Sequence, residues 1–233
     1  MGQSLPLHIK IKELLARELA AGHWRTGERL PPEASLAASL GCAVGTLRKS
    51  LAELEAQGTI ERRQGSGTYV KQAPSGKRVY DFFRLALLVG GGLPTAVVLA
   101  FDTLTHPADV PTFGTHPSPT CYRVRRLRLL NNAPIALEEI YFDTRHNAAL
   151  TINDLGEALY LFYQTQLGFW IANAQDSVSI STVPSWTNPL FALPAHTPCG
   201  FIERRSYAAT GALEEFSRTW FNPQMAHYTA YIQ

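Results

Sequence analysis

The sequence has few cysteines and no long apolar run. Cys42, Cys121 and Cys199 are the only three cysteines among 233 residues, and they lie far apart. An odd, scattered set without a CxxC pair argues against a disulfide framework or a zinc site, so we expect buried thiols in the reducing cytoplasm. No apolar run approaches the roughly 20 residues of a membrane span, and the N-terminus has no apolar stretch of a secretory signal. We therefore expect a cytoplasmic protein without a membrane partner.

Lysine is absent from the last two thirds of the chain. All five lysines lie at or before Lys77, and residues 1–78 hold 12 Lys and Arg against 7 Asp and Glu. Residues 79–233 hold 9 against 12. A basic segment joined to a mildly acidic one predicts a polyanionic partner for the first segment only.

The first 71 residues show the order helix, helix, tight turn, helix, hairpin. Apolar residues at three- and four-residue steps predict a helix over 7–21, ended by Gly22. A short helix follows Pro31–Pro32 and ends at Gly41, and a third helix begins near Val44. Alternating residues between 59 and 71 surround a glycine-rich turn, which predicts a hairpin. This order is that of a winged helix-turn-helix.

The third helix and the hairpin carry the residues expected to contact DNA. In a helix-turn-helix, the N-terminal part of the second helix meets the base edges of the major groove. Thr46, Arg48 and Lys49 face outward there, whereas the leucines of that helix face the core. Arg48 and Lys49 could equally form a solvated helix face, and the arginines of the hairpin an ordinary charged surface; the whole order of elements favours DNA binding. The expected contacts of the hairpin, the wing, are Arg62, Arg63, Gln64, Gly65, Ser66 and Gly67.

Residues 72–78 have the composition of a linker, and residues 79–233 have the pattern of an α+β domain. Short alternating runs separated by Asn, Gly and Pro predict antiparallel strand pairs. The expected strands are 121–130 with 134–142, 199–209 with 213–221, a single strand over 169–182 and a last one over 226–232, and the expected helices are 156–167 and 184–193.

Residues 5–71 resemble the DNA-binding domain of the GntR family of bacterial regulators. The most specific matches are Leu30-Pro31 followed by Glu33, the Leu40-Gly41 turn, Thr46-x-Arg48 and the run from Arg63 to Thr68. The chain departs from the family pattern at Ala34, Ala43 and Val44, where relatives carry arginine or hydroxyl side chains. Loss of those side chains implies a different operator, or more reliance on DNA shape and phosphate contact.

Residues 79–233 resemble the HutC subfamily, whose UTRA effector domain has a chorismate-lyase-like fold. The best matches are Arg126-Leu127-Arg128, the run from Pro134 to Glu138, Leu159-Tyr160, Ile202-Glu203-Arg204 and the run from Glu215 to Arg218. An aminotransferase-type partner domain would need a cofactor lysine, which this part of the chain lacks, and an all-helical metal-binding partner would lack the strand pairs. The resemblance implies that the effector pocket is lined by Arg126, Arg128, Glu138, Tyr160, Glu215 and Phe221.

The residues themselves support an anion site. Strand alternation puts Arg126 and Arg128 on one face, where two guanidinium forks make a clamp for phosphate or carboxylate. Glu138 on the paired strand would accept hydrogen bonds from the ligand; the alternative is a cross-strand salt bridge, and for Tyr160 the alternative is core packing. Ala158 stands where relatives often have serine, and Phe221 where they commonly have tyrosine. These losses predict a ligand less polar than an amino-sugar phosphate.

Other classes of function find less support. The five histidines after residue 100 are scattered without metal-ligand spacing, and no nucleophile motif or phosphate loop points to catalysis. We therefore expect no cofactor, no metal and no enzymatic activity. The prediction is a homodimeric repressor that binds a near-palindromic operator and leaves it when a small anionic metabolite binds. The alternatives are an enzyme of chorismate-lyase-like fold fused to a DNA-binding module, and a DNA-binding protein that needs no ligand.

Overall fold

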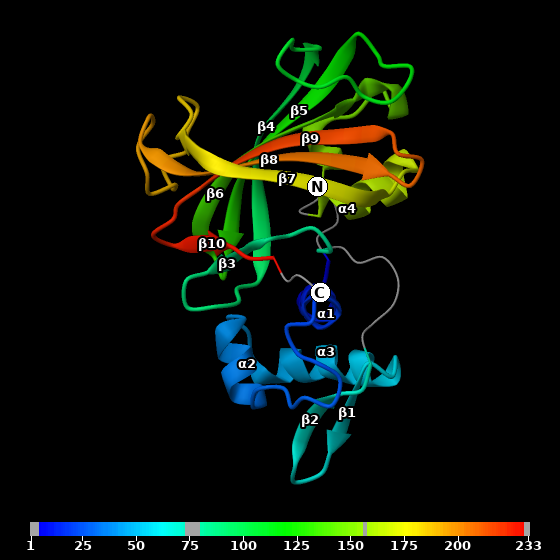
Figure 1. Cartoon of the computed structure of the whole chain (residues 1–233), viewed down its shortest axis with the longest axis vertical. Coiled ribbons are helices and arrows are strands. Elements are labelled where there is room, and N and C mark those ends of the chain that lie inside the picture. The colour runs from blue at the N-terminus through cyan, green and yellow to red at the C-terminus, as the bar shows by residue number, and fades with distance from the viewer. Residues whose placement is uncertain (1–4, 73–79, 156–157, 231–233) are drawn as a thin grey trace. The chain divides into compact units, whose positions relative to one another are not determined.

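The computed structural model describes residues 5–72, 80–155 and 158–230. The chain divides into two compact units (Figure 1). One runs from Leu5 to Leu93 and takes in the chain after Ala226, and the other is Pro94–Ala226. The predicted linker 72–78 lies, apart from Gln72, outside the described residues.

The first unit contains the predicted winged helix-turn-helix. Its helices are α1 (Leu7–Ala20), α2 (Glu33–Ser39) and α3 (Val44–Ala56), and its wing is the antiparallel pair β1 (Ile60–Arg63) and β2 (Gly67–Val70). The leucine stripes of the helices are buried together in one core. Glycines with positive φ follow α1 and α2, at Gly22 and Gly41, as expected for helix ends that need a left-handed residue.

A short ribbon adds to this unit. β3 (Leu85–Leu87) pairs with β10 (Ala226–Tyr228). The turn after β3 contains three successive glycines with positive φ, Gly90, Gly91 and Gly92. The predicted strand 226–232 is therefore shorter than expected in the described part, and residues 231–233 lie outside it.

The second unit is a six-stranded antiparallel sheet with the strand order β4-β5-β6-β9-β8-β7. The two predicted strand pairs are confirmed as β5 with β6 and β8 with β9. Asn131 and Asn132 both have positive φ and form the two-residue turn between β5 and β6. The strand bounds are β4 Pro94–Thr105, β5 Thr120–Leu130, β6 Ala133–Asp143, β7 Ile171–Thr182, β8 Pro198–Ala208 and β9 Leu213–Phe221.

Helical structure is sparse in this unit. The helix expected over 156–167 is described from α4 (Leu159–Phe162), which continues as a π-helical turn over Tyr163–Leu167 and ends at the left-handed Gly168. The short 3-10 segments are Thr144–His146 and Ile152–Asp154.

The helix expected over 184–193 is wrong, because this segment forms successive turns. Pro184, Pro189 and Pro194 interrupt the supply of backbone N–H donors that a helix needs. The Asn188 side chain instead accepts a hydrogen bond from the backbone of Leu190, which is a local turn that competes with a helix.

Candidate functional site

The N-terminal part of α3 presents its polar side chains to solvent, as predicted. Arg48 and Lys49 are exposed and Thr46 is half-buried. Arg48 donates from Nε to Oε2 of Glu33 on α2 at 2.6 Å, yet 63% of its side chain remains accessible. The alternative of a solvated helix face therefore fits the geometry as well as DNA contact does.

The wing is joined to α3 by Arg62. Its Nη2 donates to the backbone oxygen of Arg48 at 3.0 Å, and its backbone N–H donates to Glu55. Arg63 pairs with Glu61 and lies 4.4 Å from the ring centre of Tyr69. The contacts of Arg62 therefore hold the wing against α3, whereas those of Arg63 lie within the wing. The tip, Gln64, Gly65 and Ser66, is exposed, and Gly67 is half-buried.

Sequence reasoning missed Arg29, which lies against the wing. Arg29 forms an isolated antiparallel bridge with Tyr69, and Leu30 donates to the backbone oxygen of Thr68 at 2.9 Å. A Cβ added at Gly67 would lie 2.5 Å from Nε of Arg29. The loop before α2 carries no periodicity, so only the tertiary pairing shows that Arg29 adds a further cation here.

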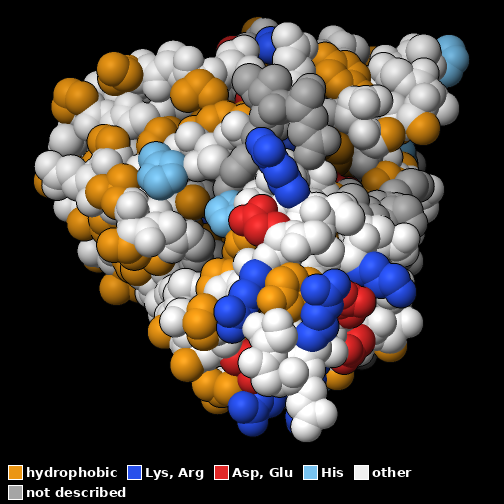
Figure 2. Space-filling view, turned by 60° about the horizontal axis from the view of Figure 1, so that its bottom comes forward, with side chains coloured by type: hydrophobic (Ala, Val, Ile, Leu, Met, Phe, Trp, Pro, Cys, Tyr) orange, Lys and Arg blue, Asp and Glu red, His pale blue; other side chains and the backbone are white. Residues whose placement is uncertain are grey.

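The basic side chains of this unit gather on one surface. Figure 2, which brings the lower part of Figure 1 forward, shows Lys and Arg side chains with a few Asp and Glu between them. Exposed ion pairs such as Arg48 with Glu33 contribute only about 0–1 kcal/mol. Exchanging the carboxylate partner for a phosphate therefore costs little.

The register of the second unit brings the predicted effector residues onto one face of the sheet. Arg126 pairs with Glu138, and in the next row Arg128, Ala136 and Phe221 lie side by side on β5, β6 and β9. Glu215 lies on the same face of β9, six residues before Phe221. The expectation that Arg126 and Arg128 share a face is thus confirmed by their common contact with Glu138.

Arg126, Glu138 and Arg128 form a buried triad. Nη2 of Arg126 lies 2.7 Å from Oε2 of Glu138, and Nη2 of Arg128 lies 3.1 Å from Oε1. Burial by itself raises the pKa of Glu138, but the two guanidinium groups outweigh it and lower the pKa to about 2. The cross-strand salt bridge, which the sequence left open as the alternative, is therefore present. The three side chains together carry one net positive charge.

Glu215 is the centre of a second buried cluster. It accepts hydrogen bonds from Tyr163 at 2.7 Å, Ser206 at 3.0 Å and Tyr160 at 3.2 Å. Burial raises the pKa of Glu215 although Tyr163 and Arg204 act in the opposite direction. Tyr160, for which core packing was the alternative, thus contacts another predicted residue of the site through its hydroxyl group.

Three polar members of this cluster were not predicted as site residues. Tyr163 and Ser206 donate to Glu215, and Arg204 makes two hydrogen bonds of 2.6 Å to Asp176. Arg204 also lowers the pKa that Tyr160 would otherwise have. Strand alternation on β8 places Arg204 and Ser206 on one face, but recognising them needed the pairing of β8 with β7 and β9.

Phe221 packs against a backbone rather than a polar group. A Cβ at Gly200, its neighbour on β8, would overlap the Phe221 ring. The ring therefore fills the space over Gly200 and makes this end of the sheet face apolar.

No helix in residues 5–72, 80–155 and 158–230 is long and apolar enough to cross a membrane. Within the same ranges, no group of three or more His, Cys, Asp or Glu could hold a metal ion.

Two family models match the chain over nearly its whole length. The model described as "Bacterial regulatory proteins, gntR family" matches residues 7–70, and the UTRA domain model matches residues 90–227. The chain belongs to the GntR family. The predicted pairing of a GntR winged helix-turn-helix with a UTRA domain, and with it the α+β fold class, is confirmed.

Whole-length relatives of this GntR protein are transcription regulators by name. It is 47% identical to the HTH-type transcriptional regulator SmoD of Agrobacterium fabrum, over 100% of this chain and 98% of that protein. It is 27% identical to the repressor MngR of Escherichia coli, over 98% and 96%. It is 20% identical to a histidine utilization repressor of Pseudomonas aeruginosa, over 89% and 84%, in agreement with the predicted HutC type. The GntR protein is thus a transcription regulator.

A solved ligand-binding domain supports the fold of the second unit. The structure comes from a GntR-family regulator of Bordetella bronchiseptica and is 20% identical, with a TM-score of 0.56 over 65% of this chain and 98% of that one. At this identity the likeness concerns the fold alone.

Proposed function

We propose that this protein is a repressor that binds its operator through the first unit, here called the winged unit, and is released when a small anionic metabolite binds the UTRA domain. The observation that carries the proposal is the combination, in one chain, of exposed arginines on α3 and the wing with buried, convergent Arg and Glu side chains on one sheet face. The first set suits a phosphate backbone, and the second suits one small ligand.

In this proposal, α3 enters the major groove and the wing follows the backbone beside it. Thr46 and Arg48 contact bases or phosphates, and Lys49 contacts phosphate. The exposed tip of the wing has no side chain at Gly65, which lets its backbone approach the DNA closely. Ala34, which is exposed on α2, and Ala43, which is exposed before α3, offer no polar group; the operator is therefore read mainly by α3 and the wing.

The proposed effector site is the sheet face that carries Arg126, Arg128, Glu138, Glu215 and Phe221, together with Tyr160 of α4, which contacts Glu215. The net positive charge of the triad attracts an anion, and charge-assisted bonds from a guanidinium are about twice as strong as neutral ones. The Phe221 ring over Gly200 favours an apolar part of the ligand at this end of the face. MngR is named for a mannosyl-D-glycerate system, and glycerate is a carboxylate, which supports an anionic ligand of carbohydrate origin.

The remaining parts of the proposal are the assembly, the compartment and the absence of turnover. We propose a cytoplasmic homodimer joined through the UTRA domains, because two winged units are needed for two half-sites of a near-palindromic operator. The ligand would favour one of two arrangements of these units. We propose no catalytic role, because the whole-length relatives are named as regulators and the Ser206 hydroxyl that donates to Glu215 is fully buried. The domain bounds that we propose from the sequence are 1–71, 72–78 and 79–233; they count residues 80–93 and 227–230 with the UTRA domain, although these residues pack with the winged unit.

The test uses fluorescence anisotropy with a labelled duplex from the region upstream of the protein's own gene. Mannosyl-D-glycerate, glycerate and a panel of sugar phosphates are added to the complex at constant ionic strength. The proposal expects that an anion from this set releases the DNA and that its uncharged parent sugar does not. Release by the uncharged sugars alone would contradict an anion site, and an absence of DNA binding at low salt would contradict the repressor itself.

A further inference from the structure

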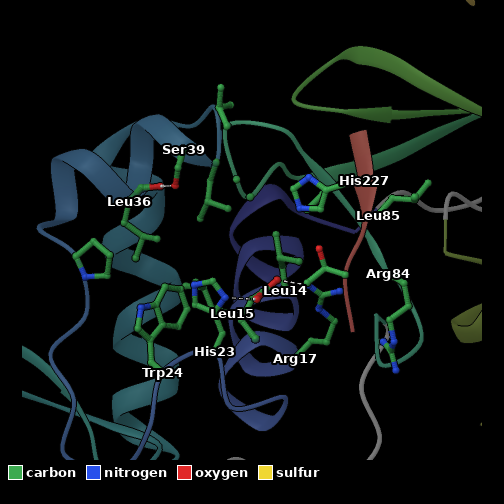
Figure 3. A pocket seen from close by; sticks show the side chains of 18 residues that line it. Leu14, Leu15, Arg17, His23, Trp24, Leu36, Ser39, Arg84, Leu85 and His227 are labelled. Carbon is green, nitrogen blue, oxygen red and sulfur yellow. Dashed lines mark hydrogen bonds and ion pairs between the residues drawn. The ribbon is translucent and has the colours of Figure 1, made fainter. Parts of the chain in front are cut away.

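The winged unit contains a pocket of about 330 Å³ that lies away from the proposed DNA contacts. Figure 3 shows it between the helices α1 and α2 on one side and the segments of Leu85 and His227 on the other. Pockets for small ligands typically span about 300–1,000 Å³. This one therefore has room for a small metabolite.

One wall of the pocket is apolar. Leu14 of α1, Leu36 of α2 and the indole of Trp24 face it (Figure 3). Pro31 and Leu40 complete this wall. An apolar wall with an aromatic ring suits the hydrocarbon part of a ligand and disfavours one that is polar all round.

Another side of the lining is charged. Arg17 of α1, Arg84 before β3 and His227 of β10 contribute to it, with Glu18 as the acidic residue of the lining. The guanidinium of Arg17 donates to the backbone oxygen of Phe83 and to Glu18. Its Nε is buried and has no hydrogen-bond acceptor within the described chain. Two guanidinium groups against one carboxylate give this side a net positive charge.

Glu18 has a second ion-pair partner, which remains when the Arg17 guanidinium turns toward a ligand. Nδ1 of His23 lies 3.3 Å from Oε2 of Glu18. A buried donor without an acceptor is destabilising, because its lost hydration is not replaced. An incoming acid group that pairs with Arg17 would provide the acceptor that Nε lacks.

We propose that this pocket is a second ligand site, for a small apolar molecule that carries one carboxylate or sulfonate group. The acid group pairs with Arg17, and the apolar body lies against Trp24 and Leu36. The site differs in chemistry from the sheet face, where several polar groups converge around Glu138 and Glu215.

The walls of the pocket come from parts of the chain that are far apart in sequence. Gly91 in the turn after β3 lies against α2, since a Cβ there would stand 3.5 Å from the backbone oxygen of Ser39. His227 and Thr229 come from β10 and the residues after it. A ligand that contacts both walls stabilises their present arrangement, because it binds that arrangement better than one in which the walls separate. The pocket thus gives the winged unit a regulatory input of its own.

The test uses 1-anilinonaphthalene-8-sulfonate, which has an aromatic body and one sulfonate, with the full-length protein. Excitation of tryptophan should produce energy transfer to one bound probe per chain. Trp24→Phe should reduce that transfer, because the other tryptophans, Trp170, Trp186 and Trp220, lie in the other unit. Benzoate should displace the probe, and benzyl alcohol should not.

Three variants decide whether the probe occupies this pocket. Arg17→Met keeps the apolar stem but removes the charge, and we expect at least a fivefold weaker affinity. Arg25→Met is the matched control, since Arg25 is exposed and lies outside the lining; it should change nothing. Ala86→Phe fills the pocket from β3 and should abolish binding, with circular dichroism to verify the fold.

Two results would overturn the proposal. The first is unchanged affinity in both Arg17→Met and Ala86→Phe. The second is binding that is lost in Ile180→Ser, because Ile180 is an 81% exposed apolar residue of β7 in the other unit. Arg126→Met, which alters the sheet face, should leave probe binding unchanged, so failure of the effector proposal and failure of this one are distinguishable.

Discussion

Arg48 of the winged unit and Arg126 of the sheet are held in opposite ways. The side chain of Arg48 in the winged unit is 63% exposed beside a Glu33 that is itself partly accessible. The side chain of Arg126 in the sheet is 4% exposed, and its partner Glu138 is 11% exposed. The Coulomb attraction within an ion pair is several times stronger at low effective dielectric, but so is the penalty for leaving one charge alone. Exposed arginines can therefore change partners freely, whereas buried ones change partners only for a ligand that replaces the lost contacts.

The largest expected effect comes from removing the carboxylate of the buried triad. Glu138→Ala leaves two buried guanidinium groups without their common partner, and we expect a loss of about 3–5 kcal/mol in the free energy of unfolding. Urea denaturation measures it. Glu203→Ala is the control, because its ion pair with Arg205 at 3.2 Å is about one third exposed and should contribute at most about 1 kcal/mol. Equal losses in the two variants would erase the contrast between buried and exposed ion pairs.

A smaller effect is expected for the exposed pair, and it concerns DNA rather than folding. Arg48→Ala should weaken DNA binding by about 1–3 kcal/mol while the free energy of unfolding changes by less than about 1 kcal/mol. Glu33→Gln should leave DNA affinity unchanged or raise it, because it releases Arg48 and removes a negative charge. Anisotropy titrations at one salt concentration measure both. A loss of affinity in Glu33→Gln would mean that the ion pair itself positions the arginine.

Lys49 should contribute a phosphate contact only. Lys49→Gln should weaken binding about equally on different DNA sequences, and it should reduce the slope of log affinity against log salt by about 1. Titrations at several salt concentrations on the upstream duplex and on an unrelated duplex measure this. A selective loss on the upstream duplex would instead assign Lys49 to base recognition.

The smallest expected effect is a dependence of the free energy of unfolding on pH. The pKa of Glu215 is raised by burial, so the folded state binds this proton more tightly than the unfolded state does. Its stabilising contribution is then present below the unfolded pKa, about 4.3, and is lost as pH rises through the folded pKa. Glu138 acts in the opposite sense, since its lowered pKa stabilises the protein above pH 4.3 and is lost toward pH 2. Unfolding curves of Glu215→Gln between pH 4.5 and 8 should lack the decline with rising pH that Glu215 causes; an identical pH profile would remove Glu215 from this role.

Much of the fold and part of the candidate site could be predicted from sequence, because the signals for them are local. Leucine spacing and the glycines after the helices define the winged unit, and alternation over 121–142 places Arg126 and Arg128 on one face. Tertiary contacts leave no such local signal. The bridge of Arg29 to Tyr69, the pairing of Arg204 with Asp176 and the Tyr163 contact with Glu215 join segments that sequence periodicity cannot bring together. The false helix at 184–193 arose because short apolar runs suit several structures, and the prolines decide against a helix.

The central claim is that DNA contact belongs to the winged unit and ligand control to the sheet face. It is tested most directly by titrating the native protein, Arg48→Ala and Arg126→Met with the labelled upstream duplex, with and without the anion that releases the native protein. We predict that Arg48→Ala binds the duplex more weakly, and that Arg126→Met binds it with native affinity but is not released by the anion. Normal release of Arg126→Met, or native affinity of Arg48→Ala, would contradict the account.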